Sequence, residues 1–161
     1  MKIFPQSCAC LSNLGEKMDA LKEILLIKEC KDLILEVAWL TDHGPHSQIV
    51  DLYTSSGSFS RDGELTVGRA SLEDMYKKRP ASLFTRHVLS NIKVKILSET
   101  EASATSYATV FRYRSEDGSS PTPPVNVSGL ESVSEYHDTF IRESGTWKIS
   151  SRILKTMIQV K

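Results

Sequence analysis

The chain has 161 residues, of which 40% are hydrophobic and 25% are charged, a composition typical of one globular domain of roughly 100–200 residues. Its 20 Lys and Arg residues balance its 20 Asp and Glu residues, so it lacks the excess positive charge that gathers nucleic acid. No stretch approaches the roughly 18–20 consecutive apolar residues of a membrane span, and we expect neither nucleic acid nor a membrane as a partner.

The three cysteines, Cys8, Cys10 and Cys30, do not have the number or the spacing of a disulfide framework. A Cys-x-Cys pair can bind a metal ion, but no second pair of Cys or His follows it at zinc-finger spacing. The first fifteen residues also lack the apolar run of roughly 7–15 residues that a signal peptide needs. We therefore expect reduced thiols, no metal site and a cytoplasmic protein.

The chain begins with a segment, residues 1–15, that shows no periodicity and is predicted to be an irregular arm. From Glu16 to about His43, apolar residues recur every three or four positions without Pro or Gly, which predicts a long amphipathic helix. If this helix is broken, the break is expected near Leu26. One face of it contains Leu21, Ile24, Leu25, Lys28, Asp32 and Leu35.

Turn-forming residues then separate several shorter elements. Gly44-Pro45 ends the long helix, because Gly suits the position after a helix and Pro cannot continue one. Ser47 is the predicted N-cap of a short helix from Gln48 to Tyr53. A short strand at Ser58–Arg61 leads into a tight hairpin turn at Asp62-Gly63. A further helix follows, predicted from Ala70 to Lys78 and stopped by Pro80.

After Phe84 the chain is rich in β-branched and aromatic residues that tend to alternate with polar ones. Four strands are predicted, at Thr85–Leu97, Ala102–Arg114, Val125–Glu143 and Thr146–Val160. The turn-like segments between them indicate hairpins, so the sheet should be mainly antiparallel. Helices followed by strands predict an α+β fold, with residues 16–161 as one domain whose helices cover one face of a curved sheet.

Several motifs, in this order, resemble the SnoaL-like branch of the NTF2-like superfamily, which includes scytalone dehydratase, bile-acid 7α-dehydratases and polyketide cyclases. They are Thr41-Asp42-His43-Gly44, Gly68-Arg69, the run from Thr85 to Asn91, and Tyr136-x-Asp138-x-Phe140-x-Arg142-x-x-Gly145-x-Trp147-x-Ile149. They span about residues 28–155. The resemblance implies a cone-shaped sheet around a largely apolar cavity closed by helices, and a homodimer or homotrimer that associates through the sheet.

Asp42 and His87 are the candidate catalytic residues. Asp42 shares a predicted helix face with Trp39, and burial among apolar side chains would raise the pKa of its carboxyl group. His87 lies in a predicted strand, on the same side as Leu89 and Asn91, and imidazole exchanges protons near neutral pH. The residues alone leave open an exposed carboxylate and a core histidine. The resemblance implies an acid–base pair, because the dehydratases use an Asp at the helix end with a His in this strand.

Six residues are expected to contact the ligand: Trp39, Tyr53, Phe59, Leu89, Asn91 and Tyr107. The dehydratases also use a Tyr on the first helix near the Asp, and this chain has none there. Tyr53, Tyr107 and Tyr113 are the alternative sources of a hydroxyl group. Trp147 is expected in the core, and Arg152 is expected on a solvated or interface face with Arg142 and Lys148.

These features predict a dehydratase, isomerase or cyclase that acts on a hydrophobic, carbonyl-bearing small molecule such as a polyketide, terpenoid or steroid. No metal or organic cofactor is expected, because the carbonyl group itself takes up the negative charge. The alternative is a non-catalytic ligand-binding or assembly module. A third interpretation is a structural subunit that resembles the small chain of aromatic-ring dioxygenases.

Overall fold

The computed structural model describes the backbone of residues 9–160 and the side chains of residues 19–160. Its helices are α1 (Ala9–His43), the 3-10 helix η1 (His46–Leu52) and α2 (Arg69–Lys77). Its strands are β1 (Tyr53–Arg61), β2 (Glu64–Val67), β3 (Leu83–Ile96), β4 (Glu101–Arg114), β5 (Ser132–Glu143) and β6 (Thr146–Gln159). No helix in this part of the chain is long and apolar enough to cross a membrane.

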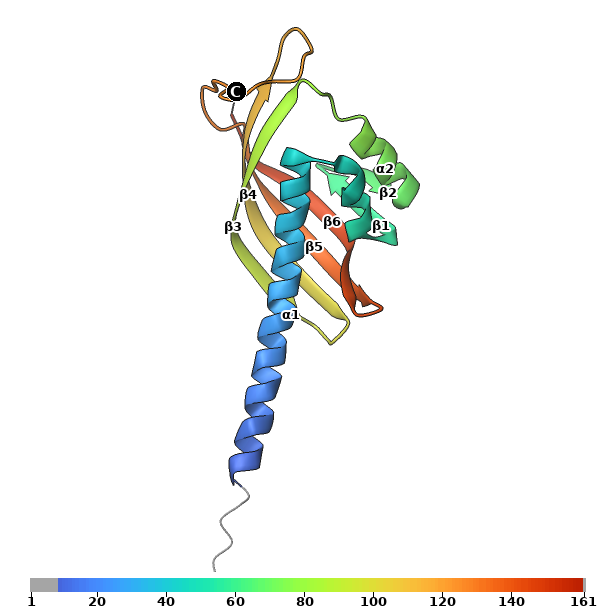
Figure 1. Ribbon diagram of the computed structural model, residues 1–161, viewed down its shortest axis with the longest axis vertical. Helices are drawn as coiled ribbons and strands as arrows, with labels where there is room; N and C mark the ends of the chain where they lie inside the picture. The colour runs from blue at the N-terminus through green and yellow to red at the C-terminus, as the bar shows by residue number, and fades with distance from the viewer. Residues whose placement is uncertain (1–8, 161) are drawn as a thin grey trace, which may run out of the picture.

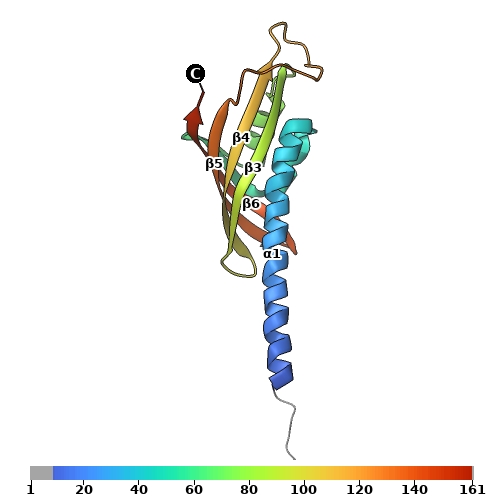
Figure 2. The same ribbon diagram turned by 90° about the vertical axis from the view of Figure 1, so that its left-hand side faces the viewer.

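The six strands form one sheet in the order β2-β1-β6-β5-β4-β3. All neighbouring strands are antiparallel except β1 and β6, which are parallel. The sheet is strongly curved, α1 runs across one of its faces, and α2 lies beside β1 and β2 (Figures 1 and 2). This arrangement confirms the predicted α+β class and the mainly antiparallel sheet.

The core lies between α1 and the sheet. The residues that α1 buries recur every three or four positions: Leu26, Cys30, Leu33, Ile34, Val37 and Leu40. They pack against inward-facing residues of the sheet, among which Phe140 and Ile149 are fully buried. Burying each such side chain contributes roughly 1.5–3 kcal/mol, which fixes the C-terminal half of α1 on the sheet. Trp147 is also buried, as predicted, and its indole N–H donates to Glu29.

Helix α1 differs from its prediction at its beginning. Residues 1–8 of the predicted arm, which include Cys8, lie outside the described residues. Helix α1 begins at Ala9, within the predicted arm, and continues past Leu26 without a break. The end of the helix is as predicted. Gly44 has a φ of +70°, and its N–H donates to the carbonyl of Leu40 over 2.8 Å. The prediction of Ser47 as an N-cap is wrong, because η1 begins at His46 after Pro45 and has no side-chain cap.

The predicted hairpin turn at Asp62-Gly63 is confirmed. Both residues have positive φ, and Arg61 pairs with Glu64 across the turn. The Asp62 carboxylate accepts hydrogen bonds from the N–H and the hydroxyl of Thr156, at 2.7 and 2.9 Å. β5 begins at Ser132, later than predicted, because residues 115–131 form the loop between β4 and β5.

Candidate functional site

Asp42 and His87 are joined by two hydrogen bonds. Asp42 lies in the last turn of α1, and His87 lies on β3 where that strand passes the end of the helix. His87 Nδ1 is 2.6 Å from Asp42 Oδ1, and the His87 backbone N–H donates to Asp42 Oδ2 over 2.7 Å. Their side chains are only 5% and 11% exposed, respectively. The helix and the sheet therefore bring these two predicted residues together in a sheltered position.

Thr85 extends this pair toward the end of α2. Its hydroxyl group donates to Asp42 Oδ1 over 2.7 Å and accepts a hydrogen bond from Arg79 Nη2 over 2.6 Å. Thr85 is buried, and it is two positions before His87, so both side chains leave the same face of β3. Arg79, Thr85, Asp42 and His87 thus form one continuous hydrogen-bonded chain.

The Asp42 carboxyl group is held in its ionised form. Burial raises its pKa, but the hydrogen bonds and charge of His87 together with the Thr85 hydroxyl outweigh burial and leave the pKa below its ordinary value of 3.8. The prediction of a raised pKa is therefore wrong, because it considered burial without the hydrogen-bond donors. In the neutral form of the imidazole, the ionised Asp42 carboxylate accepts a hydrogen bond from Nδ1–H, which leaves Nε2 as the basic nitrogen.

His87 also lines an inner cavity of about 230 Å³ on the concave face of the sheet. The nitrogens lie on opposite sides of the imidazole ring, so Nε2 points away from Asp42, and none of the described residues bonds to it. The lining contains Arg61, Asp62, Val110, Arg112, Glu131, Ser132, Ser134, Tyr136, Leu154, Thr156 and Gln159. This lining is more polar than the largely apolar cavity that the resemblance implies.

The free hydrogen-bonding capacity of the inner cavity comes mostly from donors. The Glu131 carboxylate accepts a hydrogen bond from Arg112 over 2.8 Å, and both carboxylate oxygens of Asp62 accept hydrogen bonds from Thr156. Arg61 lines the cavity without a carboxylate partner among the described residues. The cavity therefore offers guanidinium and hydroxyl groups to an oxygen atom that carries negative charge.

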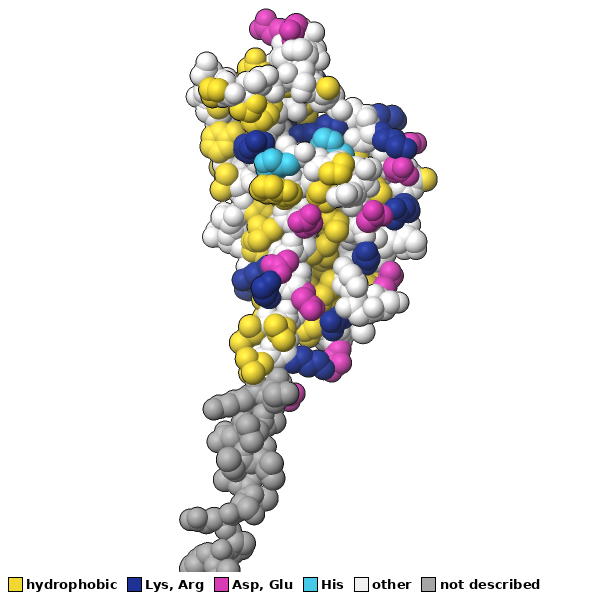
Figure 3. Space-filling model, in the orientation of Figure 1, with side chains coloured by type: hydrophobic (Ala, Val, Ile, Leu, Met, Phe, Trp, Pro, Cys, Tyr) yellow, Lys and Arg dark blue, Asp and Glu magenta, His cyan; other side chains and the backbone are white. Residues whose placement is uncertain are grey.

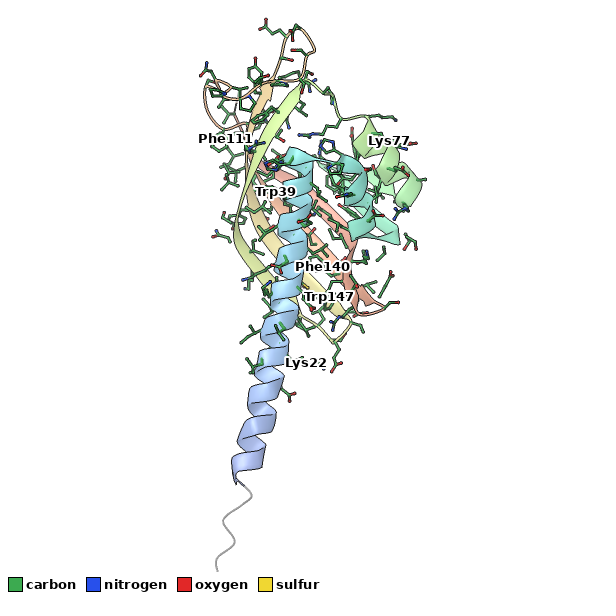
Figure 4. All side chains as sticks on the ribbon, viewed as in Figure 1. Lys22, Trp39, Lys77, Phe111, Phe140 and Trp147 are labelled. Carbon is green, nitrogen blue, oxygen red and sulfur yellow. The ribbon has the colours of Figure 1, made fainter. Side chains whose placement is uncertain are left out.

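A groove of about 680 Å³ lies on the outer side of the pair, between α1 and β3. Asp42 and His87 line it together with Trp39 and Leu89, two of the predicted ligand contacts. Trp39 is labelled near the C-terminal end of α1 in Figure 4, on the side of β3. His87 is the residue that the groove shares with the inner cavity.

The remaining predicted ligand contacts do not line either cavity. Tyr53 and Phe59 are buried in the core. Tyr107 lies on β4 between the buried residues Ser106 and Ala108, so it is exposed on the opposite face of the sheet. Tyr113 lines a separate surface cavity beside the loop of residues 115–131.

The placement of Asn91 on the same side as His87 is wrong because β3 contains a bulge. Asn91 has a φ of +50°, and the pairing with β4 shifts between Ser90 and Lys93. A bulge adds a residue to one strand and reverses the alternation beyond it. After Asn91 the core-facing residues are Ile92, Val94 and Ile96, and Asn91 itself is exposed.

Arg152 is also misplaced by the sequence prediction, since it is buried rather than solvated. It forms hydrogen bonds of 2.7 and 2.9 Å with Asp138, and the two side chains are 3% and 1% exposed, respectively. Burial lowers the pKa of Arg152, but the Asp138 carboxylate more than offsets burial, so the pKa of the guanidinium group is raised. The guanidinium group lies over the ring of Tyr136, 4.8 Å from its centroid.

Five residues of the site were given no role by the sequence analysis: Arg61, Arg79, Thr85, Arg112 and Tyr136. Alternation from His87 identifies Thr85, and alternation from Asp138 places Tyr136 on the inward face. Tyr136 supplies the phenol nearest the inner cavity, and burial raises its pKa above the ordinary value of 10.0. In the described part of the chain, no group of three His, Cys, Asp or Glu residues is placed to hold a metal ion.

Comparison with known proteins agrees with this architecture. No curated protein sequence matches the chain. A putative scytalone dehydratase from Novosphingobium aromaticivorans superposes with a TM-score of 0.74 and 18% identity, over 88% of this chain and 90% of that one. An NTF2-like protein with a cystatin-like fold, also from Novosphingobium aromaticivorans, gives 0.70 and 22%, over 94% and 92%. Hexachlorocyclohexane dehydrochlorinase LinA-type3 from Novosphingobium barchaimii gives 0.72 and 14%, over 88% and 92%.

At these identities the likeness shows a shared fold, which is the cone-shaped NTF2-like fold. Residues 22–153, which include α1 from Lys22 onward and nearly all of the sheet, match the family model described as a SnoaL-like domain. The matched range contains Asp42, Thr85 and His87 with the hydrogen bonds between them. The chain therefore belongs to the SnoaL-like family and has the NTF2-like fold.

Proposed function

We propose that this protein is a small-molecule lyase or isomerase in which His87 removes a proton from a carbon next to a carbonyl group. The observation that carries the proposal is the Asp42–His87 pair, in which a buried carboxylate holds Nδ1 and leaves Nε2 without a hydrogen-bond partner among the described residues, on a side chain that lines both cavities. A base oriented in this way is what general-base catalysis requires. SnoaL-like family membership supports lyase or cyclase chemistry on a small molecule.

The first step transfers the proton from the substrate carbon to Nε2 of His87. The electron pair of the broken C–H bond moves to the carbonyl oxygen and forms an enolate, while the imidazolium is stabilised by ionised Asp42. Arg61, which has no carboxylate partner among the described residues, lines the cavity that would hold the enolate oxygen, and a cation beside such an oxygen stabilises its charge in the transition state. Asp42 acts here as a positioning residue, since its lowered pKa keeps it from donating a proton.

The second step decides the product. If a hydroxyl group is bonded to the next carbon, the enolate electrons form a C=C bond as hydroxide leaves with the proton from His87, and water is released. If the substrate instead has a C=C bond between its β and γ carbons, the electron pair is shared with that bond as a dienolate, His87 returns the proton to the γ-carbon, and the C=C bond moves to the α and β carbons. Two structural relatives are named as a dehydratase and a dehydrochlorinase. Both names describe elimination reactions, and this supports the elimination of water.

The two cavities beside His87 suggest how such a substrate binds. The inner cavity of about 230 Å³ has the volume of roughly eight water molecules at about 30 Å³ each, and its donors suit the carbonyl end. Trp39, Leu89 and Leu35 line the groove on the other side of His87 and suit an apolar remainder. The proposed substrate is therefore a carbonyl compound with one polar end and one hydrophobic end.

Hydrogen–deuterium exchange tests the first step before the natural substrate is known. The protein is incubated in D2O with a panel of β-hydroxy ketones, and deuterium at the carbon between the two groups is measured by NMR. We expect His87→Asn to lose at least about 10²-fold of the exchange rate, because the Asn amide can still donate to Asp42 but cannot act as the base. His137→Asn is the matched control, since His137 lies on the opposite face of the sheet beside Glu135.

Two outcomes would contradict the proposal. If His87→Asn exchanges the panel as fast as the wild type, His87 is not the base. If no carbonyl compound exchanges faster with the protein than without it, while a small molecule still binds at the inner cavity, the protein is a binding module.

A further inference from the structure

A stripe of exposed residues runs along α1 on the side that faces away from the core. Its members are separated by four and three positions in turn, so they lie in one line on the helix. They are Leu21, Leu25, Lys28, Asp32, Leu35 and Trp39, hereafter the α1 stripe. The four apolar members are 56%, 58%, 47% and 59% exposed, respectively, although each would gain roughly 1.5–3 kcal/mol from burial.

The surroundings of the α1 stripe leave room for another helix. The N-terminal half of α1 extends beyond the edge of the sheet, so no strand flanks it there (Figures 1 and 2). In the space-filling view, apolar side chains gather on the surface near the lower edge of the coloured part of the molecule (Figure 3). Lys28 and Asp32 bond to each other at 2.5 Å and remain largely solvent-exposed. Exposed apolar side chains on both sides of a charged pair indicate an interaction site with an apolar and a polar part.

The α1 stripe is complementary to itself. Leu21 and Trp39 are equally distant along the helix from residue 30, as are Leu25 and Leu35, and as are Lys28 and Asp32. A second α1 that runs antiparallel, with a two-fold axis beside residue 30, therefore sets leucine against leucine and leucine against tryptophan. It also sets Lys28 of each copy against Asp32 of the other, which gives two such contacts. Self-complementarity of this kind is the condition for a two-fold symmetric interface.

We propose that α1 pairs antiparallel with α1 of a second copy of this chain through the α1 stripe. Four-and-three spacing of apolar residues is the spacing that packs two helices side by side. The charges select the direction, because a parallel pair would set Lys28 against Lys28 and Asp32 against Asp32. This contact is separate from association through the sheet, since the α1 stripe faces away from the sheet.

The pairing also reaches the candidate site. Trp39 belongs both to the α1 stripe and to the wall of the groove beside Asp42 and His87. The second copy brings its Leu21 onto Trp39, so its helix covers one side of that groove. The groove is then more enclosed in the dimer than in a single chain.

Charge reversal tests the pairing without removing apolar surface. The molar mass of the full chain is measured by sedimentation equilibrium for wild type, Lys28→Asp, Asp32→Lys and the double variant. We expect each single variant to weaken self-association by about tenfold or more, since two ion pairs become two repulsive contacts. The double variant restores opposite charges at both contacts and should associate like the wild type.

Mixing provides the sharper readout. Lys28→Asp carries two acidic residues in the α1 stripe and Asp32→Lys carries two basic ones, so equal amounts of the two should form a heterodimer although neither pairs with itself. Lys77→Glu is the matched control, because it breaks the Lys77–Glu73 ion pair of 2.9 Å on α2, away from the α1 stripe. Single variants with the same mass as the wild type would overturn the proposal and assign association to another face. A monomeric wild type would overturn it as well.

Discussion

Arg152 of β6 lies directly opposite Asp138 of β5, and the two side chains form a bidentate ion pair inside the sheet. The Arg152 guanidinium group lies over the ring of Tyr136, which lines the inner cavity together with Ser134 and Leu154. A buried ion pair does not necessarily increase stability relative to an apolar pair, but removal of one partner leaves an unpaired buried charge. The ion pair therefore holds the cavity-lining ring of Tyr136 in one position.

Breaking this pair should be costly. We expect Arg152→Met to lower the free energy of unfolding by about 3–5 kcal/mol, because the Asp138 carboxylate stays buried without its partner. The double variant Arg152→Met with Asp138→Leu should recover a large part of that loss. Denaturant unfolding measures both, with Arg114→Met at the exposed end of β4 as a control that changes stability by less than about 0.5 kcal/mol. Equal losses in the single and double variants would contradict this account of the pair.

Thr85 should matter through its hydroxyl group. Thr85→Val has nearly the same shape but removes the donor to Asp42 and the acceptor for Arg79. We expect it to lower the free energy of unfolding by about 1–3 kcal/mol, the cost of leaving buried polar groups unsatisfied. Thr85→Ser keeps the hydroxyl group and serves as the control in urea unfolding. If the two variants are equally stable, the hydroxyl group does not connect Arg79 to Asp42.

Asp42 should contribute a specific part of the pH dependence of stability. Its folded-state pKa is below the ordinary value of 3.8, so its contribution is fully present above the unfolded pKa and is lost as the pH falls through the folded pKa. We expect the wild type to lose stability more steeply than Asp42→Asn below about pH 4. At neutral pH, Asp42→Asn should be less stable by about 2 kcal/mol. Parallel pH dependences in urea unfolding would contradict the lowered pKa.

Gly57 should not tolerate a side chain. A Cβ atom there would lie 2.9 Å from the Tyr53 Cβ, 3.0 Å from the Thr54 carbonyl oxygen and 3.1 Å from the Ile149 carbonyl oxygen. Gly57→Ala must therefore displace β1 from β6, and we expect a loss of about 1–3 kcal/mol with a lower thermal midpoint. Ser55→Ala, on the exposed side of β1, is the matched control. Gly118→Ala does not serve as a control, because Gly118 has a positive φ. Similar thermal midpoints for Gly57→Ala and Ser55→Ala would contradict the prediction, because they would show that β1 accommodates a Cβ atom at position 57 without loss of stability.

The sequence predicts the features that depend on periodic patterns. The apolar spacing of three and four residues between Glu16 and His43, the hairpin residues Asp62-Gly63 and the alternation over Ala102–Arg114 are local signals, and each corresponds to an element of the fold. The Asp42–His87 candidates came from motif resemblance, and the structure shows the hydrogen bonds that no sequence pattern contains. The direction of the Asp42 pKa was predicted wrongly because it depends on those hydrogen bonds.

Two of the wrong placements share one physical cause. In β6 the pairing with β5 shifts between Thr139 and Phe140, so Trp147 and Ile149 face inward at odd positions and Arg152 faces inward at an even one. In β3 the bulge at Asn91 has the same effect. Alternation of inward and outward side chains reverses beyond a bulge. The residues at these two positions do not indicate a bulge as clearly as Asp62-Gly63 indicates a turn.

The central claim is that Asp42 holds His87 as the tautomer with a proton on Nδ1 and a free basic Nε2. Nitrogen-15 NMR of the histidine rings measures this directly, at a pH where the ring of His87 is neutral. The account predicts a protonated-type shift for Nδ1 and an unprotonated-type shift for Nε2 in the wild type, and loss of this preference in Asp42→Asn. A His87 ring with its proton on Nε2 in the wild type would contradict the account.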